Sequence, residues 1–216
     1  INDSTCMSDV CIRPINAGAP QGTRAGPNDF KVLINDLRFD LPYIKYVDDL
    51  SVATKSTNPA SNEIQSVADK ISEWASTNRM ILNTDKTKEM VIYFGRRYVK
   101  DEIKSTCIQK VAIKRIDTFK LLGVIFSSDL TWGKHVEYIV TKASKRLYAI
   151  YQLIRAGIPV ADVIIVYCSL IRSVLEYACQ VWHCGLTKSQ SDEIENVQRR
   201  CLRIIFRELS YKDALQ

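Results

Sequence analysis

The stretch KYVDDLSV, from Lys45 to Val52, places two adjacent carboxylates between two short apolar runs. The β-prone segments YIKYV and LSVAT flank Asp48 and Asp49, so a β-hairpin is predicted with these two acids at its centre. Adjacent carboxylates repel each other, and a turn needs at most one of them. The pair therefore indicates a role besides turn formation.

A divalent cation would supply that role. Mg²⁺ prefers oxygen ligands and binds through one or two carboxylates together with substrate phosphates. Two such ions held by shared carboxylates stabilise an in-line phosphoryl displacement. The alternative is a solvated turn, because Asp also favours turns in its own right.

Two further segments have the chemistry of phosphate binding. PQGT, from Pro20 to Thr23, precedes a helix predicted over residues 28–37, and a helix start favours phosphate. In NTDKTKEM, Lys86 and Lys88 lie beside a predicted turn, where a lysine could meet phosphate oxygens or donate a proton to a leaving group. The alternatives are an ordinary loop and an ordinary charged turn.

The character of the sequence changes near Trp132, where helical periodicity becomes dominant. Before it, FKLLGVIFSSDLTW predicts one strand, a Ser-Ser-Asp turn and the approach to a helix. After it we expect a helix stopped by Gly157 and Pro159, a long apolar helix over residues 161–182, and a last helix with a Thr187–Gln190 capping box. The fold class predicted is α+β.

Composition sets broad limits on function. The chain has 216 residues, a formal net charge of +6, 46% hydrophobic and 25% charged residues. The basic balance mildly favours a polyanionic partner. We find no apolar run of about 18 residues, and expect no membrane partner and no signal peptide. Seven scattered cysteines favour a reduced, intracellular and non-secreted setting.

One metal alternative lies in the second half of the chain. Cys179, His183 and Cys184 share one segment, and such residues can form a zinc site. The apolar helix predicted around them favours core cysteines instead.

Taken together and in this order, the segments resemble the reverse transcriptase domain of non-LTR (LINE-type) retrotransposons. The matching stretches are GAPQGTRAGPNDFKVLINDL (motif B), KYVDDLSV (motif C), NRMILNTDKTKEMVI (motif D) and FKLLGVIFSSDLTW (motif E, the primer grip). The resemblance implies part of a right-hand polymerase palm, an antiparallel sheet with helices, over residues 1–132. An all-α thumb and post-thumb region is implied over residues 133–216.

The resemblance also implies roles for single residues. Asp48 and Asp49 would be catalytic and would bind Mg²⁺ or Mn²⁺, and Lys86 would lie near the pyrophosphate leaving group. The partners implied are an RNA template, a DNA primer and dNTPs. The remaining implied contacts are to nucleotide and template (Gln21, Gly22, Tyr46, Val47), in the primer grip (Leu122, Gly123, Val124) and to duplex phosphates (Lys142, Lys145, Arg146).

The sequence departs from the family's pattern at its start. The family's third carboxylate, in motif A, lies upstream of PQG, and the acids there, Asp3 and Asp9, do not fit that motif. We therefore expect a fragment that lacks motif A and the fingers, needs that missing N-terminal half as a partner, and is inactive alone.

Two other interpretations stay open. One is a non-catalytic module that binds RNA or RNA–DNA duplex, and the other is a decayed copy without a selected function. A functional copy would enter the nucleus during retrotransposition.

Overall fold

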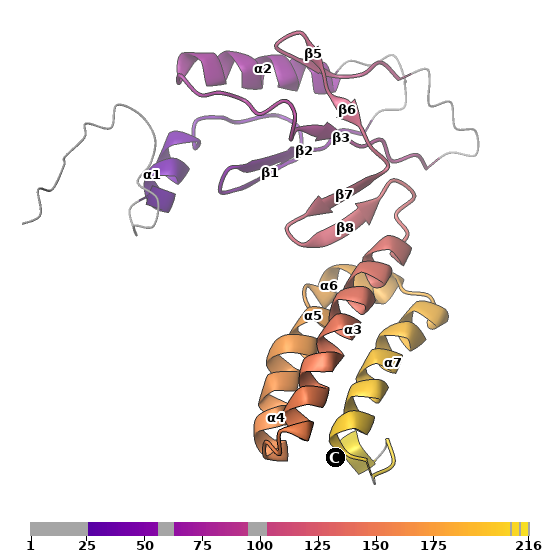
Figure 1. Cartoon of the computed structure of the whole chain (residues 1–216). Coiled ribbons are helices and arrows are strands. Elements are labelled where there is room, and N and C mark those ends of the chain that lie inside the picture. Colours follow the sequence, from indigo (N-terminus) through magenta and orange to yellow (C-terminus); the bar gives the residue numbers. More distant parts are fainter. Residues whose placement is uncertain (1–25, 56–62, 95–102, 208, 212, 216) are drawn as a thin grey trace, which may run out of the picture. The chain divides into compact units, whose positions relative to one another are not determined.

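The computed structural model describes residues 26–55, 63–94, 103–207, 209–211 and 213–215. The chain divides into two compact units (Figure 1). The first unit comes from residues 1–84 and 101–112, and the second from residues 85–100 and 113–216. Each unit contains helices and short strands, which confirms the α+β class. The boundary predicted at residue 132 stays a prediction.

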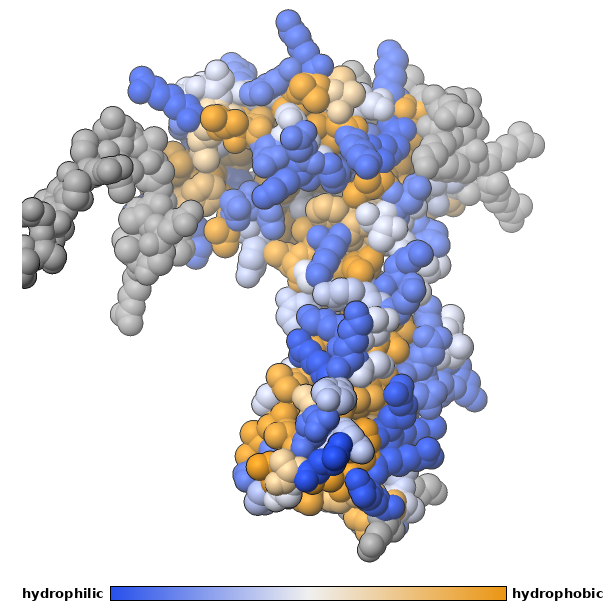
Figure 2. Space-filling view, viewed as in Figure 1, coloured by the Kyte–Doolittle hydropathy of each residue, from blue (hydrophilic) through white to orange (hydrophobic). Residues whose placement is uncertain are grey.

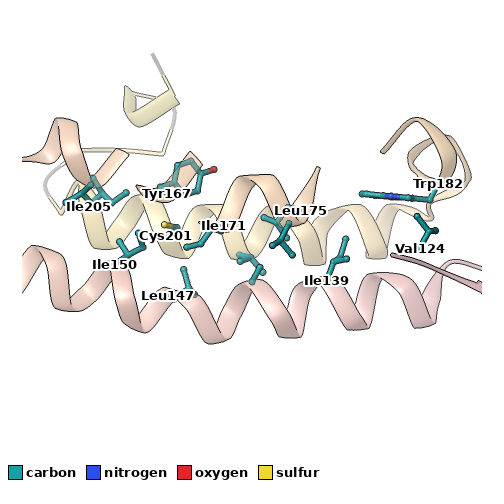
Figure 3. Close-up of a cluster of buried hydrophobic side chains, with 14 residues drawn as sticks. Val124, Ile139, Leu147, Ile150, Tyr167, Ile171, Leu175, Trp182, Cys201 and Ile205 are labelled. Carbon is teal, nitrogen blue, oxygen red and sulfur yellow. The ribbon is translucent and has the colours of Figure 1, made fainter. Parts of the chain in front are cut away.

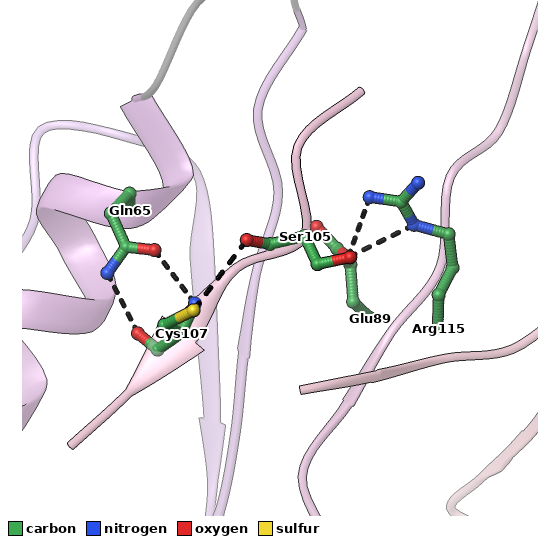
Figure 4. Close-up of polar contacts among 5 residues, drawn as sticks. All are labelled: Gln65, Glu89, Ser105, Cys107 and Arg115. Carbon is green, nitrogen blue, oxygen red and sulfur yellow. Dashed lines mark hydrogen bonds and ion pairs between the residues drawn. The ribbon is translucent and has the colours of Figure 1, made fainter. Parts of the chain in front are cut away.

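In the first unit, the described residues form two helices and two hairpins. Helix α2 buries Val67, Ala68 and Ala75 and ends at Thr77. The side-chain amide of Gln65 pairs with the backbone N–H and carbonyl of Cys107, each at 2.8 Å, so α2 holds the second hairpin by a strand-like contact (Figure 4). The elements are α1 (Gly26–Leu33), β1 (Tyr43–Tyr46), β2 (Asp49–Val52), α2 (Glu63–Thr77), β4 (Cys107–Ile108) and β5 (Val111–Ala112).

The β1–β2 hairpin confirms the predicted hairpin but corrects its centre. Tyr46 pairs with Asp49, so the turn consists of Val47 and Asp48 rather than the two acids. This register places the half-buried residues Tyr43, Lys45, Leu50 and Val52 on one face. A shift by one residue would move that set to solvent, which is why burial fixes the register.

Where the structure describes the second unit, its strands form two small pairs. Strands β3 (Lys88–Glu89) and β6 (Lys114–Arg115) pair in parallel. The Arg115 guanidinium meets a Glu89 carboxylate oxygen at 3.1 Å between largely buried side chains (Figure 4).

A β-hairpin replaces the single strand predicted in FKLLGVIF. Strands β7 (Thr118–Leu121) and β8 (Val124–Ser127) pair antiparallel around a Leu122–Gly123 turn. Both turn residues have positive φ, 46° and 89°. Positive φ at both central positions matches the right-handed twist of a two-residue hairpin. The Leu122–Gly123 turn therefore reverses the chain between β7 and β8.

Helices α3 (Gly133–Arg155), α4 (Val160–Tyr167) and α7 (Lys188–Ile205) enclose the main core. Figure 3 shows Leu147, Ile150, Ile171 and Cys201 directed into it from three segments. The predicted stop after α3 is confirmed by Gly157 at φ 73°, and the Thr187–Gln190 capping box begins α7 as predicted.

The single helix predicted over residues 161–182 is wrong. The segment is divided into α4, a π-helical turn η2 (Cys168–Arg172), α5 (Ser173–Leu175) and α6 (Cys179–Trp182), followed by the 3₁₀ turn η3 (His183–Gly185). The break falls at Ala178, whose φ is 53°. The Tyr177 carbonyl there accepts a hydrogen bond from the Trp182 indole at 3.0 Å instead of continuing the helix.

Helix surfaces in the second unit differ in polarity. Apolar side chains gather over α4 and polar ones over α7 (Figure 2). Ile165 of α4 is 63% exposed. Within the described residues, no helix combines the length and apolarity that a membrane crossing requires.

His135 joins β8 to the helices. Its side chain is 1% exposed, its Nδ1 accepts from the Ile125 N–H at 3.3 Å, and its ring meets the Trp182 ring edge-on at 5.2 Å. Burial lowers the pKa of His135 below its ordinary value of 6.5. The folded state therefore favours the neutral ring.

We predict that the free energy of unfolding falls as pH drops below about 6.5, because only the unfolded state then gains a proton at His135. The slope should approach at most about 1.4 kcal/mol per pH unit and end at the folded pKa. Urea unfolding between pH 7.5 and 5 measures it. His135→Asn should flatten the slope and His183→Gln, at the other histidine, should retain it. Equal slopes in all three proteins would contradict the assignment.

Candidate functional site

The tip of the β1–β2 hairpin carries the two predicted catalytic acids. Asp48 lies in the turn, Asp49 begins β2, and both are exposed. Tyr46, 57% exposed, is the cross-strand partner of Asp49 and shares its face. Within the described part of the chain, neither carboxylate forms a hydrogen bond or an ion pair. Their oxygens are therefore open to a ligand.

Val47 adopts a backbone conformation that is rare for its type. Its φ is 53°, in a region where the β-branched side chain crowds the backbone. The residue is 48% exposed, so packing of its side chain does not offset this cost. Such conformations persist where the surroundings hold them, and they concentrate at functional sites.

The opposite face of the hairpin is held by Lys45. Its ammonium donates a hydrogen bond to the carbonyl of Ile34, just after α1, and lies 5.4 Å from the Tyr43 ring centroid. Partial burial lowers the pKa of Lys45, although nearby Asp36 opposes the shift. Because this charge lies on the face away from Asp49, it supports the hairpin without neutralising that acid.

The outcome for three other predicted site residues is as follows. Gln21 and Gly22 lie outside the described residues. Lys86 is exposed in the turn over residues 84–86, as predicted, and belongs to the second unit.

The predicted primer-grip residues form the β7–β8 turn. Leu122 and Gly123 are the turn itself, Leu122 is 42% exposed, and Val124 is 5% exposed in the core. The Leu122 carbonyl accepts a hydrogen bond from the Tyr177 hydroxyl at 3.0 Å. Sequence reasoning missed Tyr177, although a Gly inside an apolar strand pattern does signal a close backbone approach.

The predicted duplex contacts divide into two groups. Lys142 and Lys145 are exposed on α3. Arg146 is half-buried, and its guanidinium donates to the Leu170 carbonyl in the π-helical turn. Lys142 and Lys145 are available to a ligand, whereas Arg146 already forms a hydrogen bond that joins α3 to the π-helical turn.

A third exposed lysine, Lys120 of β7, belongs with Lys142. The Lys120 ammonium donates to the Tyr138 hydroxyl at 2.8 Å, and Lys142 lies 5.7 Å from the same ring centroid. The hydrogen bond from Lys120 lowers the pKa of Tyr138. We call Lys120, Lys142 and Lys145 the lysine cluster. Sequence reasoning missed Lys120 because it lies 22 residues before Lys142.

The prediction that Cys179 and Cys184 are core cysteines is only partly correct. Cys179 is half-buried against the core, but Cys184 is exposed rather than a core cysteine. Across the described residues, no three His, Cys, Asp or Glu side chains are gathered as a metal-binding group.

Comparison with known proteins identifies the family. The profile described as reverse transcriptase (RNA-dependent DNA polymerase) matches residues 6–126. This range contains both acids of the hairpin tip and the β7–β8 turn. The chain belongs to the reverse transcriptase family, which confirms the predicted resemblance.

The relatives come from mobile elements of Drosophila. The chain is 27% identical over 203 residues to a probable RNA-directed DNA polymerase from transposon X-element of Drosophila melanogaster, covering 88% of this chain and 22% of that protein. It is 26% identical over 208 residues to the RNA-directed DNA polymerase from mobile element jockey of the same species, with 90% and 22% covered. The chain thus spans about a fifth of the length of these relatives. No solved structure matches the chain.

We predict that Val47→Gly stabilises the first unit by up to about 1 kcal/mol, because removing Cβ relieves positive-φ strain by more than it costs in chain entropy. Ile44→Gly is the matched control, since Ile44 is exposed on β1 but has no positive φ, and it should destabilise. Urea unfolding followed by circular dichroism measures both. Destabilisation of equal size in the two variants would contradict the strain.

Proposed function

We propose that this chain carries the metal-binding carboxylates and the primer-holding elements of an RNA-directed DNA polymerase of a non-LTR retrotransposon. The proposal places a polymerase palm over residues 1–132 and a thumb over residues 133–216. The observation that carries it is the exposed Asp48–Asp49 pair on a strained hairpin tip, within the segment that matches the family.

The hairpin tip suits a hydrated divalent cation. Mg²⁺ usually keeps several waters and binds through one or two carboxylates plus substrate phosphates. Two adjacent, exposed acids that form no ion pair with any described residue match that requirement. Asp48 and Asp49 would hold the metal, and the bound ion would neutralise charge on the reacting phosphates. Gln21, Gly22, Tyr46 and Val47 would contact nucleotide and template.

The remaining residues would position the nucleic acid. Leu122, Gly123 and Val124 would hold the primer, and the lysine cluster would meet duplex phosphates through sequence-independent charge contacts. Lys86 would act near the leaving pyrophosphate as a proton donor. The substrates proposed are an RNA template, a DNA primer and dNTPs.

A second candidate is a module that binds RNA–DNA duplex without catalysis. The lysine cluster favours it, because three exposed lysines from β7 and α3 attract phosphate independently of any metal. Duplex binding that persists in EDTA, with no metal bound at the hairpin tip, would select this function over the polymerase.

The metal site is tested first with Mn²⁺ as a paramagnetic probe. We predict selective broadening of backbone NMR signals of residues 46–50 in the wild-type chain. The effect should be lost in Asp48→Asn combined with Asp49→Asn, and retained in Asp40→Asn, an exposed acid of the same unit. An unchanged wild-type spectrum would overturn the proposed metal site.

The same substitutions test catalysis. In a longer protein that joins this chain to the N-terminal half carrying motif A, Mg²⁺-dependent extension of a DNA primer on an RNA template should fall about 100-fold or more in Asp48→Asn, because a catalytic metal contributes several kcal/mol and each 1.36 kcal/mol is tenfold. Asp40→Asn should extend as the wild type does. Extension that survives Asp48→Asn would remove this acid from the mechanism.

Salt dependence tests the lysine cluster. Replacing Lys142 and Lys145 together by Gln should weaken duplex binding and reduce the slope of log K against log salt by about 1 per lysine that meets a phosphate. Lys110→Gln, an exposed lysine of the first unit, is the control. Fluorescence anisotropy between about 50 and 200 mM salt spans the useful range. Parallel slopes for all proteins would contradict the phosphate contacts.

A further inference from the structure

The β7–β8 turn is contacted by Tyr177, which lies 55 residues after Leu122 in the sequence. The Tyr177 hydroxyl donates to the Leu122 carbonyl at 3.0 Å. A Cβ atom at residue 123 would lie only 2.9 Å from Cε1 of the Tyr177 ring. Glycine is therefore favoured at residue 123 for two reasons. Its φ of 89° is strained for other residues, and the Tyr177 ring packs where a Cβ atom would lie.

Tyr177 is itself held in place from the core side. Its carbonyl accepts a hydrogen bond from the Trp182 indole N–H at 3.0 Å, and Trp182 is 1% exposed. Ala178 follows in the left-handed conformation, φ 53°, which turns the chain out of the helix. The phenol thus projects from backbone that a buried tryptophan fixes.

Side-chain hydrogen bonds hold the strands of the hairpin against α3. The Ile125 N–H of β8 donates to His135, and the Lys120 ammonium of β7 donates to the Tyr138 hydroxyl. Lys120 and Ile125 pair with each other across the hairpin, next to the Leu121–Val124 pair that closes the turn. The turn itself is contacted by Tyr177 through the Leu122 carbonyl. Loss of the Tyr177 contact would leave the turn free to move relative to strands that stay attached.

The tip contact lies at the surface and contributes little to global stability. Tyr177 is 54% exposed and Leu122 42% exposed. A single exposed hydrogen bond of this kind contributes much less to stability than the burial of Trp182. The main physical effect of the Tyr177–Leu122 hydrogen bond is to restrict the orientation of the turn.

We infer that Tyr177 is a positioning residue that fixes the Leu122–Gly123 turn and thereby sets the orientation of the primer 3′ end. This inference rests on the proposed function, since it takes the β7–β8 turn as the part that meets the primer. Tyr177 acts through the turn and contacts neither metal nor nucleotide.

The test compares Tyr177→Phe, which removes one oxygen, with Tyr148→Phe, which removes the same atom from an exposed tyrosine of α3. Amide hydrogen exchange at residues 122–125 reports the turn. The fluorescence of 2-aminopurine at the primer 3′ end of a bound RNA–DNA duplex reports the primer. Urea unfolding and duplex affinity report whether the fold and the binding surface are intact.

In Tyr177→Phe we expect exchange at the turn to be about 2- to 10-fold faster, as loss of one hydrogen bond allows. We also expect altered 2-aminopurine fluorescence, with duplex affinity within about twofold of wild type. Gly123→Ala should reproduce both changes by displacing the ring, and Tyr148→Phe should show neither.

Unchanged exchange at the turn, or faster exchange with unchanged primer fluorescence, overturns the inference. Failure of the wild-type chain to bind the duplex overturns the proposed function instead. In that case the exchange rates still decide whether Tyr177 holds the turn.

Discussion

Burial of the Trp182 indole is the interaction on which the second unit depends. A buried indole N–H must find an acceptor, and here it takes the Tyr177 carbonyl, which lies just after α5 ends at Leu175. The same ring packs edge-on against His135, whose Nδ1 receives the Ile125 N–H. One aromatic side chain thus contacts Tyr177 and His135, the two residues that hydrogen-bond the backbone of the β7–β8 hairpin at Leu122 and Ile125. The same hairpin carries Lys120 of the lysine cluster.

The first unit is organised around a different constraint. Two adjacent acids at a hairpin tip, one in the turn and one at the start of β2, repel each other and are tolerated only where solvent or a cation screens them. The fold leaves both exposed and directs the nearby ammonium of Lys45 to the other face of the hairpin. It also accepts a valine with positive φ beside them. Charge repulsion and backbone strain each cost free energy locally. Binding of a metal and phosphate would offset the charge repulsion, as expected of a binding site.

Local pattern predicted the elements whose interactions are themselves local. The hairpin at KYVDDLSV, the stop at Gly157 and the Thr187–Gln190 capping box depend on residues within a few positions of each other. The failures were of another kind. The helix over residues 161–182 has continuous helical hydrophobicity, but the chain breaks at Ala178, where the Tyr177 carbonyl accepts from the indole of Trp182, a side chain buried in the tertiary core. The run FKLLGVIF is almost continuously apolar, like one buried strand, but the chain reverses at Gly123 beneath the Tyr177 ring.

The sequence by itself determined the family, the α+β class, and the two carboxylates with their place on a hairpin, because a motif of fixed spacing carries that information in the chain alone. Only the tertiary structure decided which residue turns the hairpin, that Arg146 is occupied by the Leu170 carbonyl, and that Lys120 and Tyr177 join residues far away in the sequence. The physical reason is range. Propensity and hydrophobic period act over a few residues, whereas buried polar groups take whichever partner the packed core brings within hydrogen-bonding distance.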